Sequence, residues 1–427
     1  MTRCDVSRRA MLLGSVSAVG AALASRSAIA QQTTRLRMFW WGSKERADRT
    51  FKVNDLYSAK NPDIKIDGET IGWADYWPRM ATQAAGRNLP DIIQMDYRYI
   101  FEYARRGALR PLNDLMPKLL DIADFGENSI NSGAVDGKLY GVNLGNNSTA
   151  MIVAAETYQQ AGVTPPEASI TWEAFADRAA AFTKAAGKDK LFGTQDAGGV
   201  EPAFEGFVRQ RGKELYGADG KLGFTAEDAS EWFAYWDKLR KMKACPPADL
   251  QALDKLNIET NLLTIGNAAI AFAHSNQLVG YQAVNQKKLA LAMQPSGAKP
   301  GQYLKPSMLF SISAGSKNAE AAAQVINFYV KDAEAVKALG VERGVPASKT
   351  SRELAAGTLD DLGKAMLDYV AFVTDKVGPL PPPPPKGAGE IQFVLKRINE
   401  EVGFSKTTAQ QGGANFVAEA ASILSRG

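Results

Sequence analysis

The chain has 427 residues, 45% of them hydrophobic and 22% charged, which is the composition of a globular protein with about two domains. The formal net charge is +4, of which the first thirty residues supply +3, so the remaining chain is nearly neutral and gives no reason to expect nucleic acid or acidic membrane as a partner. One histidine, and one cysteine beyond residue 30, exclude an internal disulfide and a histidine-rich zinc site.

Residues 1–30 have the features of an export signal. Arg8 and Arg9 precede an apolar run from Ala10 to Ala24, and the segment ends in Ala28-x-Ala30, which suits signal peptidase. The paired arginines are typical of twin-arginine export. The alternative is a retained membrane anchor, but the run is shorter than the roughly 20 residues that a span needs. We therefore expect a mature periplasmic protein that begins near Gln31.

Strands and helices alternate through the next part of the chain. Buried or alternating strands are predicted at 35–42, 64–71 and 91–96, and helical spacing at 47–62, 74–90 and 99–112. This order indicates a parallel α/β sheet, in which ligands bind beyond the carboxyl ends of the strands.

The rest of the chain continues in the same style. A strand pair with a helix is predicted at 138–162, and helices at 171–187, 225–242 and 318–330. Strands are predicted at 191–197, where the strand runs into a glycine-rich turn, and at 267–275 and 307–316. Thr171 is the expected N-cap of its helix. Trp232 and Trp236 share one helical face and are expected in the core. Five prolines, Pro381–Pro385, predict a stiff connector.

Several segments together resemble the extracellular solute-binding proteins of carbohydrate ABC transporters, of the maltose-binding type. The segments are PDIIQMDYRYIFEYARRGALRPL, KLYGVNLGNNSTAMIV, GNAAIAFAHSNQLVGY and the stretch from SMLFSISAGS to GVPASKTS. Their order and spacing carry the resemblance over nearly the whole mature chain. One departure is His274-Ser275-Asn276, which stands where the family often has a tryptophan that stacks on sugar.

The resemblance implies an α/β, two-lobed periplasmic-binding-protein fold of the class II type, with ligand between the lobes. Lobe one would comprise residues 31–145 and 296–342, and lobe two residues 147–292 and 347–427. Hinge crossovers are expected near Asn146-Asn147, Pro295 and Val345-Pro346. Closure around the ligand would be bending at these few residues.

Sugar chemistry selects the candidate site residues of lobe one. Indole rings cover the apolar faces of a pyranose, and carboxylates and amides bind its hydroxyls. Such residues follow the first and third strands and open the second helix. The candidates are Trp41, Ser43, Glu45, Trp73, Asp96 and Tyr97. The competing role is core or hinge packing for Trp41, and helix packing for Trp73.

Further candidates lie at the crossovers and in lobe two. They are Asn146, Asn147, Gly198, Gly199, Glu201, His274, Asn276, Tyr303, Ser307 and Arg343. The glycines would let backbone N–H groups approach a ligand. A turn is the competing role for the asparagines, a structural histidine for His274 and a structural ion pair for Arg343, which is expected to face the cleft.

The sequence thus predicts a binding protein rather than an enzyme. It would capture a mono- to trisaccharide, with an α-galactoside as the favoured example, and deliver it to the membrane permease of an ABC importer. The protein is expected to be a monomer that needs no metal or cofactor and binds with near-micromolar affinity, worth about −8 kcal/mol. An exported glycoside hydrolase, and a binding protein for an acidic sugar, an amino acid or a peptide, remain alternatives.

Overall fold

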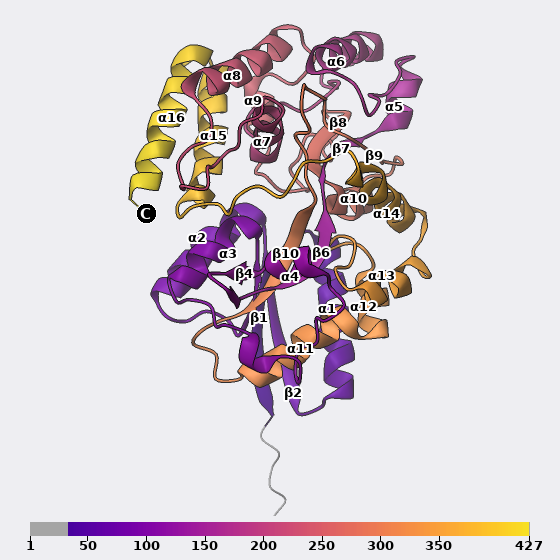
Figure 1. Cartoon of the computed structure of the whole chain (residues 1–427). Helices are drawn as coiled ribbons and strands as arrows, with labels where there is room; N and C mark the ends of the chain where they lie inside the picture. The colour runs from indigo at the N-terminus through magenta and orange to yellow at the C-terminus, as the bar shows by residue number, and fades with distance from the viewer. Residues whose placement is uncertain (1–32, 427) are drawn as a thin grey trace, which may run out of the picture.

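The computed structural model describes residues 33–426 and shows two lobes, one above the other in Figure 1. The predicted export signal, residues 1–30, lies outside the described residues. Within 33–426, no helix is both long and apolar enough to span a bilayer.

The first lobe is built on a five-stranded sheet with the strand order β2-β1-β3-β10-β6. The strands are β1 (Thr34–Trp41), β2 (Ile64–Ile71), β3 (Ile92–Met95), β6 (Val142–Asn147) and β10 (Lys305–Ile312). β1 pairs in parallel with β2 and β3, as the sequence predicts. β10, which returns from the distant end of the chain, pairs antiparallel with β3 and β6.

Helices cover both faces of this sheet (Figure 1). They are α1 (Lys44–Lys60), α2 (Trp73–Ala85), α3 (Tyr97–Arg105), α11 (Ala319–Lys331), α12 (Ala333–Leu339) and α13 (Lys349–Ala356). The short elements of this lobe are the 3-10 helix η1 (Asn113–Leu115), α4 (Glu127–Asn131), β4 (Ala134–Val135) and β5 (Lys138–Leu139).

The alternation of side chains along β1 explains its two neighbouring tryptophans. Met38 and Trp40 belong to the core beneath α1 and α11, whereas Phe39 and Trp41 belong to the core beneath α2 and α3. Successive residues of a strand point to opposite faces, so a sheet covered on both sides buries both tryptophans.

The second lobe has a smaller, antiparallel sheet with the order β8-β7-β9. Its strands are β7 (Thr149–Val153), β8 (Ile270–His274) and β9 (Ala290–Ala292). Its helices are α5 (Ala155–Gln160), α6 (Trp172–Ala186), α7 (Glu201–Arg209), α8 (Ala226–Lys241), α9 (Ala248–Gln251), the 3-10 helix η2 (Ser275–Gln277), α10 (Leu278–Val284), α14 (Asp361–Thr374), α15 (Ala388–Gly403) and α16 (Ala409–Ser425). Trp232 and Trp236 are fully buried, and Thr171 caps α6, both as predicted.

One predicted element of the second lobe is wrong. Residues 191–197 form no strand; only Phe192 makes an isolated bridge, to Ala268, and Gln195 donates its backbone N–H to the backbone oxygen of Ile270. Gly193 within this segment disfavours an extended ladder, and the segment instead runs as a loop toward α7.

The C-terminal part of the chain contributes helices to both lobes. α13 packs on α11 and α12 of the first lobe, whereas α14 contacts β9 and α10, and α16 packs along α8. Pro381–Pro385 have no regular secondary structure and connect α14 with α15, in agreement with the predicted connector. Asn146 and Val345 exchange backbone hydrogen bonds of 2.8 and 2.9 Å, so two of the predicted crossovers lie side by side. The lobe boundaries themselves stay a prediction.

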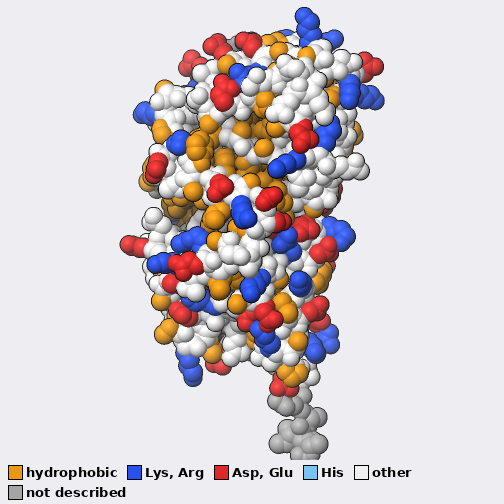
Figure 2. All heavy atoms as spheres, turned by 90° about the vertical axis from the view of Figure 1, so that its right-hand side faces the viewer, with side chains coloured by type: hydrophobic (Ala, Val, Ile, Leu, Met, Phe, Trp, Pro, Cys, Tyr) orange, Lys and Arg blue, Asp and Glu red, His pale blue; other side chains and the backbone are white. Residues whose placement is uncertain are grey.

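The surface in Figure 2 mixes charged side chains of both signs, and apolar side chains gather in its upper half. α10 and α14 lie on this side of the molecule in Figure 1. Each carries an exposed large apolar residue, Val284 and Phe372 respectively. No single sign of charge dominates this face.

Candidate functional site

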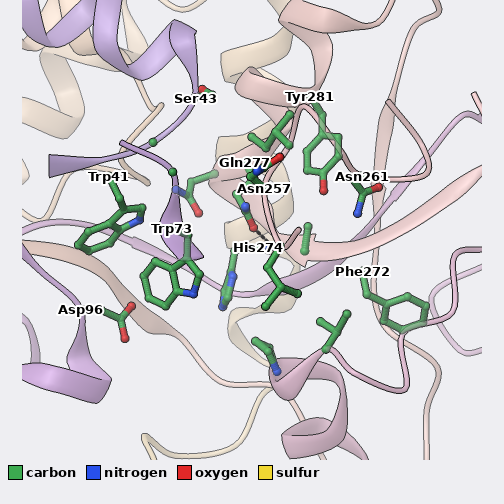
Figure 3. Close-up of a pocket in the computed structure, with 18 of the residues that line it drawn as sticks. Trp41, Ser43, Trp73, Asp96, Asn257, Asn261, Phe272, His274, Gln277 and Tyr281 are labelled. Carbon is green, nitrogen blue, oxygen red and sulfur yellow. Dashed lines mark hydrogen bonds between the residues drawn. The ribbon is translucent and has the colours of Figure 1, made fainter. Parts of the chain in front are cut away.

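A cavity with a volume of about 190 Å³ lies between the two lobes. In this measure one water needs roughly 10–15 Å³, so the cavity has room for a small polar molecule. Its walls come from the strand ends β1, β3, β8 and β10, the starts of α2 and α7, and the loop 254–261. In Figure 3, Trp41 and Trp73 lie on one side, Asn261, Tyr281 and Phe272 on the other, and His274 between them.

Two tryptophans form the aromatic wall of the first lobe. The rings of Trp41 and Trp73 meet edge to face, with centroids 5.1 Å apart. Trp41 is only 7% exposed and also packs against Tyr76 and Trp77. Trp73 is half-buried, and its indole N–H donates to Gln392 Oε1 of α15 at 3.2 Å. Trp41 therefore belongs to the core and the cavity together.

Asp96 lies at the end of β3, where it both caps α3 and holds a cation. One carboxylate oxygen accepts from the Arg98 backbone N–H at 2.9 Å, and the other accepts from Lys305 Nζ at 2.7 Å. Burial by itself raises the pKa of this carboxyl, but the charges of Lys305 and Arg98 and these hydrogen bonds outweigh burial, and the pKa lies below its ordinary value. Asp96 is therefore ionised at neutral pH.

The other cations of the cavity wall are paired as well. Arg98 of the first lobe forms an ion pair with Glu201 of the second lobe and donates to Gln392 at 3.2 Å. Arg46 donates to Glu342 at 2.8 Å. Each of the three cationic side chains that line the cavity thus faces a carboxylate, which offsets its charge.

His274 ends β8 in the middle of the cavity. Burial, and next the positive charge of Lys305, lower the pKa of its imidazole to about 3. The side chain is therefore neutral at physiological pH and can accept or donate a hydrogen bond to a ligand.

Amide side chains line the cavity at the hinge. Asn147 Nδ2 donates to Asn276 Oδ1 at 2.6 Å, and Asn276 Nδ2 donates to the backbone oxygen of Glu342 at 3.2 Å. This chain of bonds joins β6, η2 and the segment before Val345. Asn147 Oδ1 is buried and has no partner among the described residues, so it is an acceptor available to a ligand.

Ten of the predicted site residues line this cavity. They are Trp41, Ser43, Trp73, Asp96, Asn147, Gly199, Glu201, His274, Asn276 and Ser307. They come from both lobes, as the expected cleft requires. Whether each one contacts a ligand stays a prediction.

Six predicted residues do not line the cavity, and each has another local role. Glu45 pairs with Arg49 along α1 at 2.6 Å, and Gly198 packs against Asn399. Asn146 accepts a hydrogen bond from Asn143 in the hinge at 3.2 Å.

The other three residues are Arg343, Tyr97 and Tyr303. Arg343 does not face the cavity as expected: it is buried inside the first lobe, where its guanidinium donates to Thr50 Oγ1 at 2.7 Å. Tyr97 and Tyr303 border a separate small cavity beneath the proline segment, and Tyr303 donates to Glu205 there at 3.0 Å.

Sequence reasoning missed a large part of the second-lobe wall. The missed residues include Gln195, Asp254, Asn257, Asn261, Phe272, Gln277, Tyr281 and Gln392. Most lie on loops or helices without a strand end to mark them, and Gln392 reaches the cavity from the C-terminal α15. A polar loop rich in Asp and Asn at 254–261 was the only local signal. Residues 33–426 contain no group of three or more His, Cys, Asp or Glu side chains that could hold a metal ion.

Comparison with known proteins assigns the family. Residues 52–362 match the family model described as bacterial extracellular solute-binding protein. A lactose-binding protein of Rhizobium radiobacter is 24% identical over 236 residues, which are 53% of this chain and 53% of that protein. The chain thus matches about half the length of this curated relative.

Solved structures resemble the whole described chain. An extracellular solute-binding protein of family 1 from Alicyclobacillus acidocaldarius is 31% identical with a TM-score of 0.64, and the match covers 92% of this chain and 98% of that one. A periplasmic oligogalacturonide-binding protein from Yersinia enterocolitica, solved with saturated digalacturonic acid, is 22% identical with a TM-score of 0.81 and coverages of 92% and 99%. The second likeness concerns the fold alone. Because the family model spans most of the chain and a relative of 31% identity spans nearly all of it, this protein belongs to the bacterial extracellular solute-binding proteins, a family of binding proteins with the two-lobed α/β fold that its sequence predicts.

Proposed function

We propose that this protein captures a small carbohydrate in the cavity between its lobes and delivers it to the permease of an ABC importer when the cleft closes. One observation carries the proposal: the cavity sets the rings of Trp41 and Trp73 opposite amide, imidazole and carboxylate groups of the second lobe. Flat apolar surface combined with fixed hydrogen-bonding groups is what a sugar ring requires.

The size of the cavity supports a mono- to trisaccharide. Part of such a ligand would lie within the about 190 Å³ between the lobes and the rest toward its opening. The relative from Rhizobium radiobacter is named for lactose, a galactoside, which supports a galactoside as the first ligand to test. Lactose has a β linkage, so the α linkage in the proposal rests on the sequence alone, and the affinity is proposed to be near micromolar.

The charge of the cavity favours a neutral sugar over an acidic one. Arg46, Arg98 and Lys305 are each paired with a carboxylate, so their positive charges are already offset and attract an incoming uronate less than free cations would. The Yersinia protein, with digalacturonic acid, shows that the fold also accommodates acidic sugars, and that ligand therefore belongs in the test.

Export to the periplasm follows from the family together with the predicted signal at residues 1–30. The family is extracellular. A twin-arginine route and a monomeric state are part of the proposal and rest on the sequence alone.

The competing activity is glycoside hydrolysis. Asp96 and Glu201 line the cavity, but each is tied to a cation, whereas a general acid needs a raised pKa. Asp254 has such a raised pKa, so hydrolysis is decided by experiment. Incubation of the pure protein with lactose and other disaccharides, followed by measurement of new reducing ends, separates the two: turnover would establish hydrolysis.

The direct test is a thermal-shift screen with neutral, amino and acidic mono- and disaccharides, followed by titration calorimetry of the sugars that stabilise the protein. A ligand of the folded state at 100 times its Kd stabilises it by about 2.7 kcal/mol, which is a measurable rise in melting temperature. A melting temperature unmoved by every sugar in the panel contradicts the proposed function.

A further inference from the structure

We propose that Gln195, Asn261 and Asp254 form a hydroxyl-binding subsite in the second lobe, which selects hydroxyls of the sugar over a carboxylate substituent. The inference rests on the proposed function and deepens it, because it assigns the ligand's charge at one end of the cavity. None of these three residues follows a predicted or observed strand end, and the sequence alone did not point to them.

All three side chains line the cavity and are nearly closed off from solvent. Gln195 is 1% exposed, and Asp254 and Asn261 are buried as well. Figure 3 shows Asn261 beside Tyr281 at the end of the cavity away from Trp41 and Trp73. A ligand that rests on the aromatic wall of the first lobe therefore has this group across from it in the second lobe.

The backbone fixes the orientation of the amides. Asn261 Oδ1 accepts from the Leu263 backbone N–H at 3.0 Å, so the other branch of this amide must be the NH₂ group. That nitrogen donates to Gln195 Oε1 at 2.6 Å and to Asp254 Oδ2 at 3.0 Å. Both partners therefore lie within hydrogen-bonding distance of one nitrogen atom, and the oxygen of Gln195 is already engaged.

What remains free is one donor and one acceptor. Gln195 Nε2 is buried and has no hydrogen-bond partner among the described residues. Asp254 Oδ1 accepts a single bond, from the Leu256 backbone N–H at 2.8 Å, and no cation lies within ion-pair distance of the carboxylate in the described part of the chain. Each carboxylate oxygen has two lone pairs, so Asp254 can accept further bonds.

A buried N–H₂ group without a partner costs about 1–3 kcal/mol, and at the wall of a cavity a bound molecule can remove that cost. The unpaired donor is explained if a ligand supplies the acceptor. A hydroxyl can accept from Gln195 and donate to Asp254, and two neighbouring hydroxyls of a sugar can divide these roles.

An acidic substituent fits this pair less well. A carboxylate accepts from Gln195 but is repelled by Asp254, whereas an ammonium group is attracted by Asp254 although it offers no lone pair to Gln195. Burial raises the pKa of Asp254 to about 6, so the carboxylate is mostly ionised at pH 7.5. The subsite therefore favours hydroxyl groups of the sugar over a carboxylate.

The test measures calorimetric affinity at pH 7.5 for lactose, galactose, galactosamine and galacturonic acid. Wild type is compared with Gln195→Met and Asp254→Asn, which preserve side-chain volume approximately. The matched control is Gln294→Met, because Gln294 is also buried with an unpaired Nε2 but does not line the cavity. Melting temperatures of the ligand-free variants report folding.

We expect lactose or galactose to bind wild type, galacturonic acid to bind at least about tenfold more weakly than galactose, and galactosamine to bind more tightly than galacturonic acid. Gln195→Met and Asp254→Asn should each weaken binding of the neutral sugar about tenfold or more, which is the loss of one buried hydrogen bond, while Gln294→Met leaves affinity within about twofold. Equal affinity of both subsite variants and wild type, or tighter binding of galacturonic acid than of galactose, would overturn the subsite and leave the carbohydrate carrier intact. If none of the four probes binds to folded wild type, the subsite is overturned. If, in addition, no sugar of the wider thermal-shift panel binds, the proposed function is overturned as well.

Discussion

At the scale of single residues, the structure gives Trp41 two tasks. Its ring lines the cavity, yet it is almost fully buried among Trp73, Tyr76 and Trp77. The sequence offered core and site as alternatives, and the packing shows that one indole serves both. Trp73 shares the cavity wall but retains more exposure.

Replacement of these tryptophans should separate stability from binding. Trp41→Ala removes a buried indole, so we expect a loss of about 3–5 kcal/mol in the free energy of unfolding as well as weaker sugar binding. Trp73→Ala should weaken sugar binding with a smaller loss of stability, because its ring is half-buried. Denaturant unfolding and calorimetry measure the two effects, and equal destabilisation by both variants would contradict this assignment.

Asp96 is expected to matter for folding before it matters for a ligand. Asp96→Ala removes the cap of α3 and leaves Lys305 buried without its partner, which together should cost about 3–5 kcal/mol. Asp67→Ala is the matched control. The Asp67–Arg35 ion pair has a similar length, 2.8 Å, but it is largely exposed, so its loss should cost far less stability. Urea unfolding of the two variants provides the comparison. Losses of the same size would show that the Asp96 pair is no stronger than a surface pair.

At the scale of elements, α3 of the first lobe lies against the start of α15 of the second. The Tyr99 hydroxyl donates to the Gly389 backbone oxygen at 3.0 Å, and Gln392 Nε2 donates to the same hydroxyl at 2.7 Å. Trp73 and Arg98 also reach Gln392. This contact fixes how closely the lobes approach one another beside the cavity.

The contact depends on a glycine. A Cβ atom at Gly389 would overlap the Tyr99 ring, so Gly389→Ala should hold the lobes apart and weaken sugar binding. Gly315→Ala is the control, because a Cβ there meets nothing within 4 Å. Small-angle X-ray scattering with and without sugar is the measurement. We expect a larger radius of gyration for Gly389→Ala only, and an unchanged radius would mean that Tyr99 moves aside within a closed molecule.

At the scale of the whole molecule, buried ionisable groups sit between the lobes and couple stability to pH. Burial, and next the charge of Glu201, raise the pKa of Glu205 to about 7, while burial lowers that of His274 to about 3. Because the folded state raises the pKa of Glu205 above its ordinary value near 4.5, binding of this proton stabilises the fold. The stabilisation is fully present below pH 4.5 and is lost as the pH rises through 7. The lowered pKa of His274 acts in the opposite direction, with stability lost as pH falls below about 6.5.

Glu205→Gln isolates the first of these effects. The amide oxygen can still accept from Tyr303, but the side chain no longer ionises. We expect the variant to gain stability relative to wild type as pH rises from 5 to 8, by up to a few kcal/mol. Melting temperatures across this range provide the measurement, and a difference that stays constant with pH would show that the proton of Glu205 is not linked to folding.

The amino-acid sequence by itself determined the local elements and the family. The alternating residues of 64–71, the Thr171 cap and the apolar run at 92–95 follow from chain geometry and solvent, and they appear where predicted. Strand ends also marked Trp41, Asp96 and His274, since a parallel or mixed α/β sheet brings such ends to one edge. Where glycine weakened the pattern, as at 191–197, the prediction of a strand was wrong.

Tertiary structure alone decided which of these side chains face the cavity and what they meet there. Arg343 lies inside the first lobe and donates to Thr50. Gln195 and Asp254 line the cavity from loops, and Gln392 lines it from a helix near the C-terminus. Periodicity reports which face of an element is buried, but not which distant segment covers it. The pairing of Arg98 with Glu201, and of Asn261 with Gln195 and Asp254, joins residues between 7 and 103 positions apart, and only the packing of the folded chain specifies such partners.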